Sequence, residues 1–88
     1  MLSQKINNQV TLIAYATVSN LFATFQNPKM RGEKFSWDKF PEIAESMVAT
    51  QVFCNVVCKD SKKQKEAEMQ GKKMGREIAA NLVKQMIQ

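Results

Sequence analysis

The sequence predicts an all-α fold: a small bundle of about three helices, built from residues 1–88 as one domain. Apolar residues recur at helical spacing in three segments, and one longer break with Pro28 and Gly32 interrupts them. No run of alternating residues with a turn signal supplies a pair of strands. A chain of 88 residues buries a limited core, so we expect close helix packing, or dimerisation, to complete the bundle.

The first helix is predicted over residues 6–26. Its apolar stripe at helical spacing consists of Ile6, Val10, Ile13, Thr17, Leu21 and Phe25, with Leu12, Ala16 and Phe22 beside it. Residues 6–28 carry no charge, and this length suits a transmembrane span. Asn20 and several hydroxyl residues interrupt the run, however, and polar residues crowd both of its ends. We therefore interpret the segment as a core helix and not as a membrane span, and we expect no membrane partner.

Residues 27–40 are predicted to form the one real loop. Phe35, Trp37 and Phe40 lie among basic residues that include Arg31. Such a mixture can stack on single-stranded nucleic acid, and Trp and Arg are also enriched where proteins bind proteins. The favoured interpretation is a loop that folds its aromatic side chains onto a small core. Trp37 and Arg31 remain candidate partner-binding residues.

The second helix is predicted over residues 41–58, with Pro41 in its first turn and Glu42 and Glu45 near its positive end. Residues 52–58 are rich in β-branched side chains and are also compatible with a strand. Two adjacent apolar faces follow from helical spacing. The first consists of Ile43, Met47, Thr50, Cys54, Val57 and Cys58, and the second of Ala44, Val48, Val52 and Val56.

The third helix is predicted over residues 61–87, because Ser61 and Gln64 have the spacing of a capping box. Gly71 and Gly75 are unusual inside a helix, where each glycine costs about 1 kcal/mol relative to alanine. We interpret Gly71, Gly75 and Ala79 as a row of small residues that lets another helix approach closely. The alternative is a break near Gly71.

Composition argues against catalysis. The chain has no histidine, and no nucleophile is paired with a base. Cys54 and Cys58 are four residues apart, with no further residues to complete a metal site. We interpret both as small buried residues of a protein in a reducing cytoplasm. The sequence thus predicts no enzyme, no metal and no cofactor.

The predicted function is that of a small regulatory, inhibitory or adaptor protein that binds a protein partner through a helical surface. The extra apolar arc of the third helix is the predicted surface: Met69, Ala80, Val83, Met86 and Ile87. A second copy of the chain is the first partner to consider, because a symmetric homodimer would cover this arc.

The alternative function is sequence-independent DNA or RNA binding through a basic face. That face consists of Lys62, Lys65, Lys72, Lys73 and Arg76. Helical spacing also predicts ion pairs that counter this charge, namely Lys62 with Glu66, Lys65 with Glu68, Glu68 with Lys72, and Lys73 with Glu77. Protein binding is therefore the favoured function.

Overall fold

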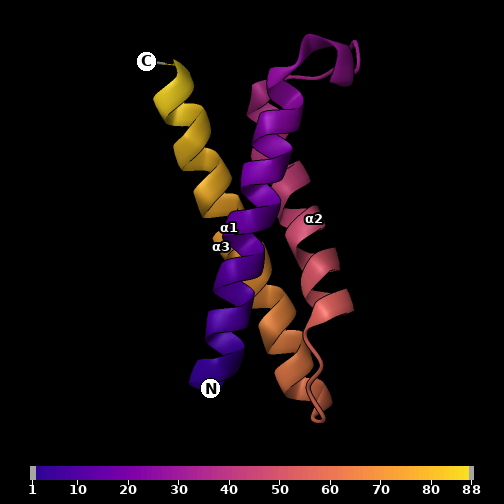
Figure 1. The fold of residues 1–88 in the computed structure, drawn as a ribbon, viewed down its shortest axis with the longest axis vertical. Coiled ribbons are helices and arrows are strands. Elements are labelled where there is room, and N and C mark those ends of the chain that lie inside the picture. The colour runs from indigo at the N-terminus through magenta and orange to yellow at the C-terminus, as the bar shows by residue number, and fades with distance from the viewer. Residues whose placement is uncertain (1, 88) are drawn as a thin grey trace.

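The computed structural model describes residues 2–87, which form three α-helices and no strand. The helices are α1 (Gln4–Gln26), α2 (Phe40–Asn55) and α3 (Ser61–Ile87), and two 3-10 turns, η1 (Pro28–Met30) and η2 (Trp37–Lys39), lie between α1 and α2. Figure 1 shows an elongated bundle in which α1 crosses α3 and α2 lies beside both. The predicted all-α bundle is confirmed.

The helix ends differ from the predicted ones at three places: the start of α1, the start of α2, which is Phe40 instead of Pro41, and the end of α2. α1 begins at Gln4, because the Ser3 hydroxyl oxygen accepts a hydrogen bond of 3.3 Å from the Ile6 amide. α2 ends at Asn55, and Val56 is extended with φ −109° and ψ 117°. Residues 56–58 are therefore outside the helix, and residues 52–58 do not form a strand. Extended backbone suits the β-branched pair Val56 and Val57.

The predicted capping box at Ser61 is wrong. The Asp60 carboxylate, and not the Ser61 hydroxyl, accepts from the Lys62 amide at 2.9 Å. The Gln64 side-chain oxygen accepts a hydrogen bond of 2.9 Å from the backbone N–H of Cys58. This bond links the first turn of α3 to the segment that connects α2 and α3. An acidic cap at this end also interacts favourably with the helix dipole.

Apart from Phe40, the core is built from short side chains that recur every fourth position along the helices. α1 contributes Val10, Ala14 and Val18, and α2 contributes Phe40, Ala44, Val48 and Val52; the remaining core residues are Val56, Ala67, Ala79 and Val83. On α2 the second predicted face is the buried one, whereas Met47, Thr50 and Cys54 of the first face are exposed. On α1, Leu12 and Ala16 are exposed, contrary to the prediction.

Gly71 and Gly75 are buried where α3 meets α2, and α3 passes through both without a break. A Cβ atom built on Gly71 would lie 2.8 Å from Val52 Cγ2, and one built on Gly75 would lie 2.8 Å from Val48 Cγ2. Ala79, the third small residue of the row, is fully buried. The two helices are therefore closer here than a side chain at either glycine allows.

The loop between α1 and α2 is held by its aromatic residues. Phe35 stacks on Phe25 with ring centroids 4.7 Å apart, and Trp37 meets Phe35 and Phe40 edge to face at 5.1 and 5.3 Å. The Arg31 guanidinium lies over the Trp37 ring, 5.9 Å from its centroid. Among the described residues, no helix is both long enough and apolar enough to cross a membrane.

Candidate binding surface

The binding surface predicted on α3 is only partly exposed in the structure. Ala80 and Met86 are exposed, and Met69 is 68% exposed, but Val83 is only 8% exposed and packs in the core. Val83 is buried because it continues the inward row of Ala67, Gly71, Gly75 and Ala79 at four-residue spacing. The side chain of Ile87 lies outside the described part of the chain. The predicted arc is therefore not one continuous exposed surface.

The two candidates in the loop are also not a free surface. Trp37 is half-buried against three phenylalanines, including Phe22 at 5.4 Å, and Arg31 covers its ring. An Arg31 guanidinium nitrogen donates to the Gln26 carbonyl oxygen at 3.4 Å, which ties the loop to the end of α1. Trp37 is thus packed as the favoured interpretation of the loop expects, and it is not displayed for a partner.

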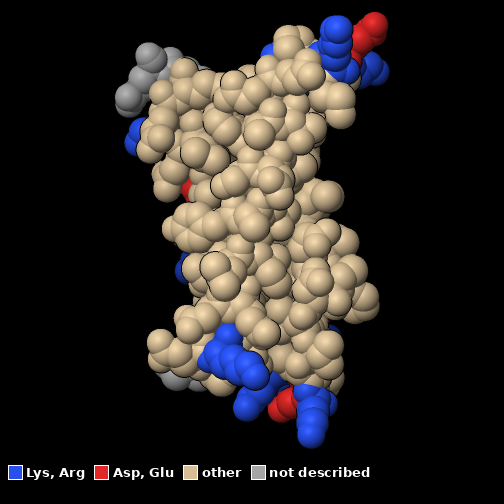
Figure 2. Space-filling model, viewed as in Figure 1, with Lys and Arg blue, Asp and Glu red and all other residues tan. Residues whose placement is uncertain are grey.

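The surface over α1 and α2 carries almost no charge. Residues 6–28 and 46–58 are both free of charged side chains, and they form most of α1 and the last two-thirds of α2. These helices lie side by side (Figure 1). Figure 2 shows the middle of the broad side as uncharged, with most of the visible charged side chains at its two ends and a few along one edge. Interface centres are depleted of charge in the same way.

We define the uncharged face as the exposed residues of α1 from position 8 to position 24, together with Met47 and Gln51 of α2. Several large apolar side chains are open to solvent there. Leu12 is 71% exposed, Tyr15 is 56% exposed, and Met47 is also exposed. Single exposed apolar residues are ordinary, but a group of them on a surface without charge is typical of a binding site.

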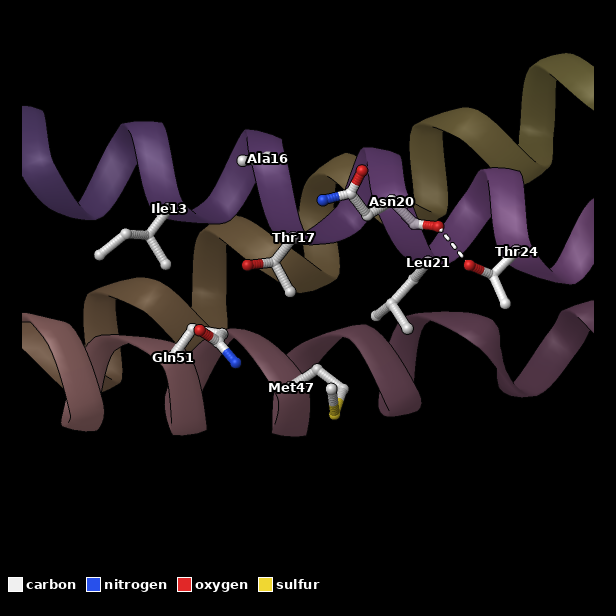
Figure 3. A pocket seen from close by; sticks show the side chains of 8 residues that line it. All are labelled: Ile13, Ala16, Thr17, Asn20, Leu21, Thr24, Met47 and Gln51. Atoms are coloured by element: carbon white, nitrogen blue, oxygen red, sulfur yellow. Dashed lines mark hydrogen bonds between the residues drawn. The ribbon is translucent and has the colours of Figure 1, made fainter.

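A groove of about 400 Å³ runs between α1 and α2 on this face. Its lining residues are Ile13, Ala16, Thr17, Asn20, Leu21, Thr24, Met47 and Gln51. Figure 3 shows Ile13, Thr17 and Leu21 of α1 directed towards Met47 and Gln51 of α2. The Thr24 hydroxyl donates to the Asn20 carbonyl at 2.8 Å, so its polar group is already satisfied. The groove offers apolar walls together with the side-chain amides of Asn20 and Gln51, and the Gln51 amide oxygen already accepts a hydrogen bond of 3.2 Å from the Asn55 side chain.

A second groove, of about 530 Å³, lies between the start of α1 and α3. Leu2, Asn7, Glu66, Met69, Gln70 and Lys73 line it. The Gln70 amide donates to the Asn7 side-chain oxygen at 2.9 Å, which joins the two helices. Met69 and Lys73, predicted for different functions, therefore line the same groove, whose walls combine apolar, polar and charged side chains.

The predicted basic face is exposed on α3. Lys62, Lys65, Lys72 and Lys73 are all open to solvent, and the Arg76 guanidinium forms an ion pair of 2.8 Å with Glu45 of α2. Three predicted pairs do not form among the described residues: Lys65 with Glu68, Glu68 with Lys72, and Lys73 with Glu77. The Glu68 carboxylate instead accepts a hydrogen bond of 3.3 Å from the side-chain amide of Gln64. The lysines are less compensated than helical spacing predicts.

The cysteines differ from the prediction as well. Both are free thiols, but Cys54 is exposed on α2 and Cys58 is only half-buried. The face with Cys54 points outward because the neighbouring row of alanine and valine residues fills the space beside α3. Within the described residues, no three side chains of the metal-binding types come together.

The signal that predicts the uncharged face was present in the sequence. Residues 6–28 stand out because they lack charge, and residues 46–58 lack it too. Only the packing of α1 beside α2 combines these two runs into one surface. Comparisons with protein-family models, with curated proteins and with solved structures give no match to this chain.

Proposed function

We propose that this protein acts without catalysis, by binding another protein through its uncharged face. The observation that carries the proposal is the segregation of charge: the part of α1 after Lys5 and the second part of α2 present a broad surface on which Tyr15 and Cys54 are the only ionisable side chains. Leu12, Tyr15 and Met47 are exposed on it. Their burial on a partner is favourable by about 25 cal/mol for each Å² of apolar area removed from water.

The groove supports the choice of a protein as the partner. Its apolar walls suit an aliphatic or aromatic side chain, and the Asn20 and Gln51 amides can each both donate and accept a hydrogen bond at its edge. Backbone amides of a protein need such groups when they leave water. The groove residues include no acid, amine or thiol, which supports binding over acid–base or covalent chemistry.

A photo-crosslinking amino acid at position 15 tests this proposal in cells that express the chain. We expect a covalent adduct with a defined protein at Tyr15 and no such adduct at Met69, which is similarly exposed on α3. With that protein purified, Tyr15→Glu should weaken binding by about tenfold or more, the loss typical of a central interface residue. Met69→Glu is the matched control, with the same added charge. Equal adducts at both positions would contradict the proposal.

DNA or RNA binding is the second candidate, favoured by one observation. Lys62, Lys65, Lys72 and Lys73 are exposed on α3, and three of the ion pairs expected to neutralise this face do not form among the described residues. The sign and exposure of these side chains suit phosphate contact. Replacing the four lysines by glutamine should reduce the salt dependence of any binding, since each lost phosphate contact lowers the slope by about one. No retention of DNA or RNA at low salt would eliminate this candidate.

A further inference from the structure

We infer that the occupant of the uncharged face is a second copy of this chain, placed antiparallel about a two-fold axis that passes between Ala16 and Ser19 of α1. The inference rests on the proposed function and names its partner. Two observations support it: the distribution of charge and the order of side chains along the exposed ridge of α1.

Charge favours this face over the basic surfaces of the molecule for contact between two copies. The chain has a formal net charge of +5, and α3 and the loop after α1 carry most of its lysines and arginines. Two copies that meet through those surfaces would bring like charges together, which is unfavourable. Two copies that meet through the middle of the broad side shown in Figure 2 largely avoid that repulsion.

The exposed ridge of α1 is self-complementary when it is reversed. Leu12, Ala16, Ser19 and Ala23 are all exposed and follow one another at spacings of four, three and four residues. That order is the same in both directions along the helix. In an antiparallel pair, Leu12 of one copy therefore lies opposite Ala23 of the other, and Ala16 lies opposite Ser19. Large residues then meet small ones, as in closely packed helix pairs.

The small residues at the centre of the ridge would let the two α1 helices approach closely. Ala16 also lines the groove beside α2, so a helix seated on the ridge would cover the mouth of the groove (Figure 3). This arrangement would remove Leu12, Tyr15 and Met47 from water together, and these are the large exposed apolar residues of the face.

A dimer interface of the standard size would need most of the broad side of the molecule. A standard interface buries about 800 Å² on each partner. The accessible surface of the chain is 6265 Å², and its broad side extends over 41 by 23 Å. A rectangle of these dimensions covers about 940 Å², so a contact of the standard size would extend from the uncharged part of α1 over most of that side.

Sedimentation equilibrium in reducing buffer, which excludes a disulfide through exposed Cys54, tests the dimer. We expect the wild-type chain to be a dimer at tens of micromolar, and Leu12→Glu to raise the dissociation constant about tenfold or more. Met69→Glu adds the same charge at an equally exposed position on α3 and should leave the dimer intact. A wild-type monomer throughout, or a dimer broken by Met69→Glu alone, would overturn the inference.

A residue exchange tests the antiparallel register. Leu12→Ala should weaken the dimer because the large side chain is lost, and Ala23→Leu should weaken it because two leucines then face each other. The double variant Leu12→Ala/Ala23→Leu restores one large residue opposite one small residue and should recover most of the affinity. Both positions are exposed, so circular dichroism should show unchanged helix content. Additive losses in the double variant would exclude this register.

The two proposals fail in different ways. A wild-type chain that stays monomeric, yet is crosslinked through position 15 to a different protein, would exclude self-association and leave the proposed function supported. A monomer without a specific adduct at position 15 would exclude both.

Discussion

Gly71 and Gly75 determine how closely α3 packs against α2, because neither residue has a side chain. Each costs an isolated helix about 1 kcal/mol relative to alanine, yet both lie in the middle of α3. In the folded chain their missing side chains leave room for Val48 and Val52 of α2. The close packing between α2 and α3 thereby offsets the low helix propensity of the two glycines.

Gly75→Ala should therefore destabilise the protein, although alanine is the better helix former. The new Cβ would lie 2.8 Å from Val48 Cγ2, 3.1 Å from Val48 Cβ and 3.3 Å from the Ala44 carbonyl oxygen, so both side chain and backbone of α2 must shift. Overpacking of this kind costs about 1–3 kcal/mol in urea denaturation. Gly32→Ala is the control, because a Cβ there meets no atom within 4 Å. A gain in stability at Gly75 would contradict this contact.

At the scale of the element, the beginning of α3 depends on Asp60. The Asp60 carboxylate accepts a hydrogen bond from the backbone N–H of Lys62. The Asp60 backbone carbonyl accepts another, of 3.0 Å, from the backbone N–H of Gln64. Ser61, in contrast, is already inside the helix. Sequence spacing predicts the right start for α3 but assigns the cap to the wrong residue, because two residues with capping side chains stand next to each other.

Asp60→Ala should lower the free energy of unfolding by about 1 kcal/mol, the usual effect of removing an N-cap. Ser61→Ala should change it by a few tenths at most, since this exposed side chain makes no capping bond and alanine is the better helix former. Chemical denaturation of both variants under identical conditions measures the difference. A larger loss of unfolding free energy for Ser61→Ala than for Asp60→Ala would show that Ser61 is the N-cap, as the sequence predicts.

The loop between α1 and α2 is a second case in which the environment of an element decides its role. Its basic and aromatic residues are compatible with nucleic-acid stacking, with a binding hot spot, or with burial. The rings of Phe35 and Trp37 pack on Phe25 and Phe40, residues that belong to the two flanking helices. A loop between two antiparallel helices can bury its aromatic residues only when both helix ends are present.

For the whole molecule, the contacts between the three helices are unequal. α2 and α3 approach through the glycines, whereas α1 and α2 are separated along part of their length by a groove of about 400 Å³. Regions with fewer buried apolar contacts open at lower free energy. The isolated chain should therefore expose the amides of α1 before those in the middle of α3.

Hydrogen–deuterium exchange of the Leu12→Glu variant tests this difference without self-association. We expect peptides from the middle of α1 to exchange faster than peptides around Gly71 and Gly75. In the wild-type chain the same α1 peptides should become slower as concentration rises, since a second copy would cover them. Protection of α1 equal to that of α3 in the variant would show that the groove does not weaken α1.

The sequence by itself determined the all-α class and the approximate extents of the three helices, because helical periodicity, Pro28 and the start near Ser61 are local properties of the chain. Only the tertiary structure decided which apolar face of each helix is buried. Leu12 and Val10 have similar hydrophobicity, and so do Met47 and Val48, yet one member of each pair is exposed and the other is in the core. The glycines fix the approach of α2 to α3, α1 covers the remaining side, and the uncharged residues left outside form the candidate binding surface.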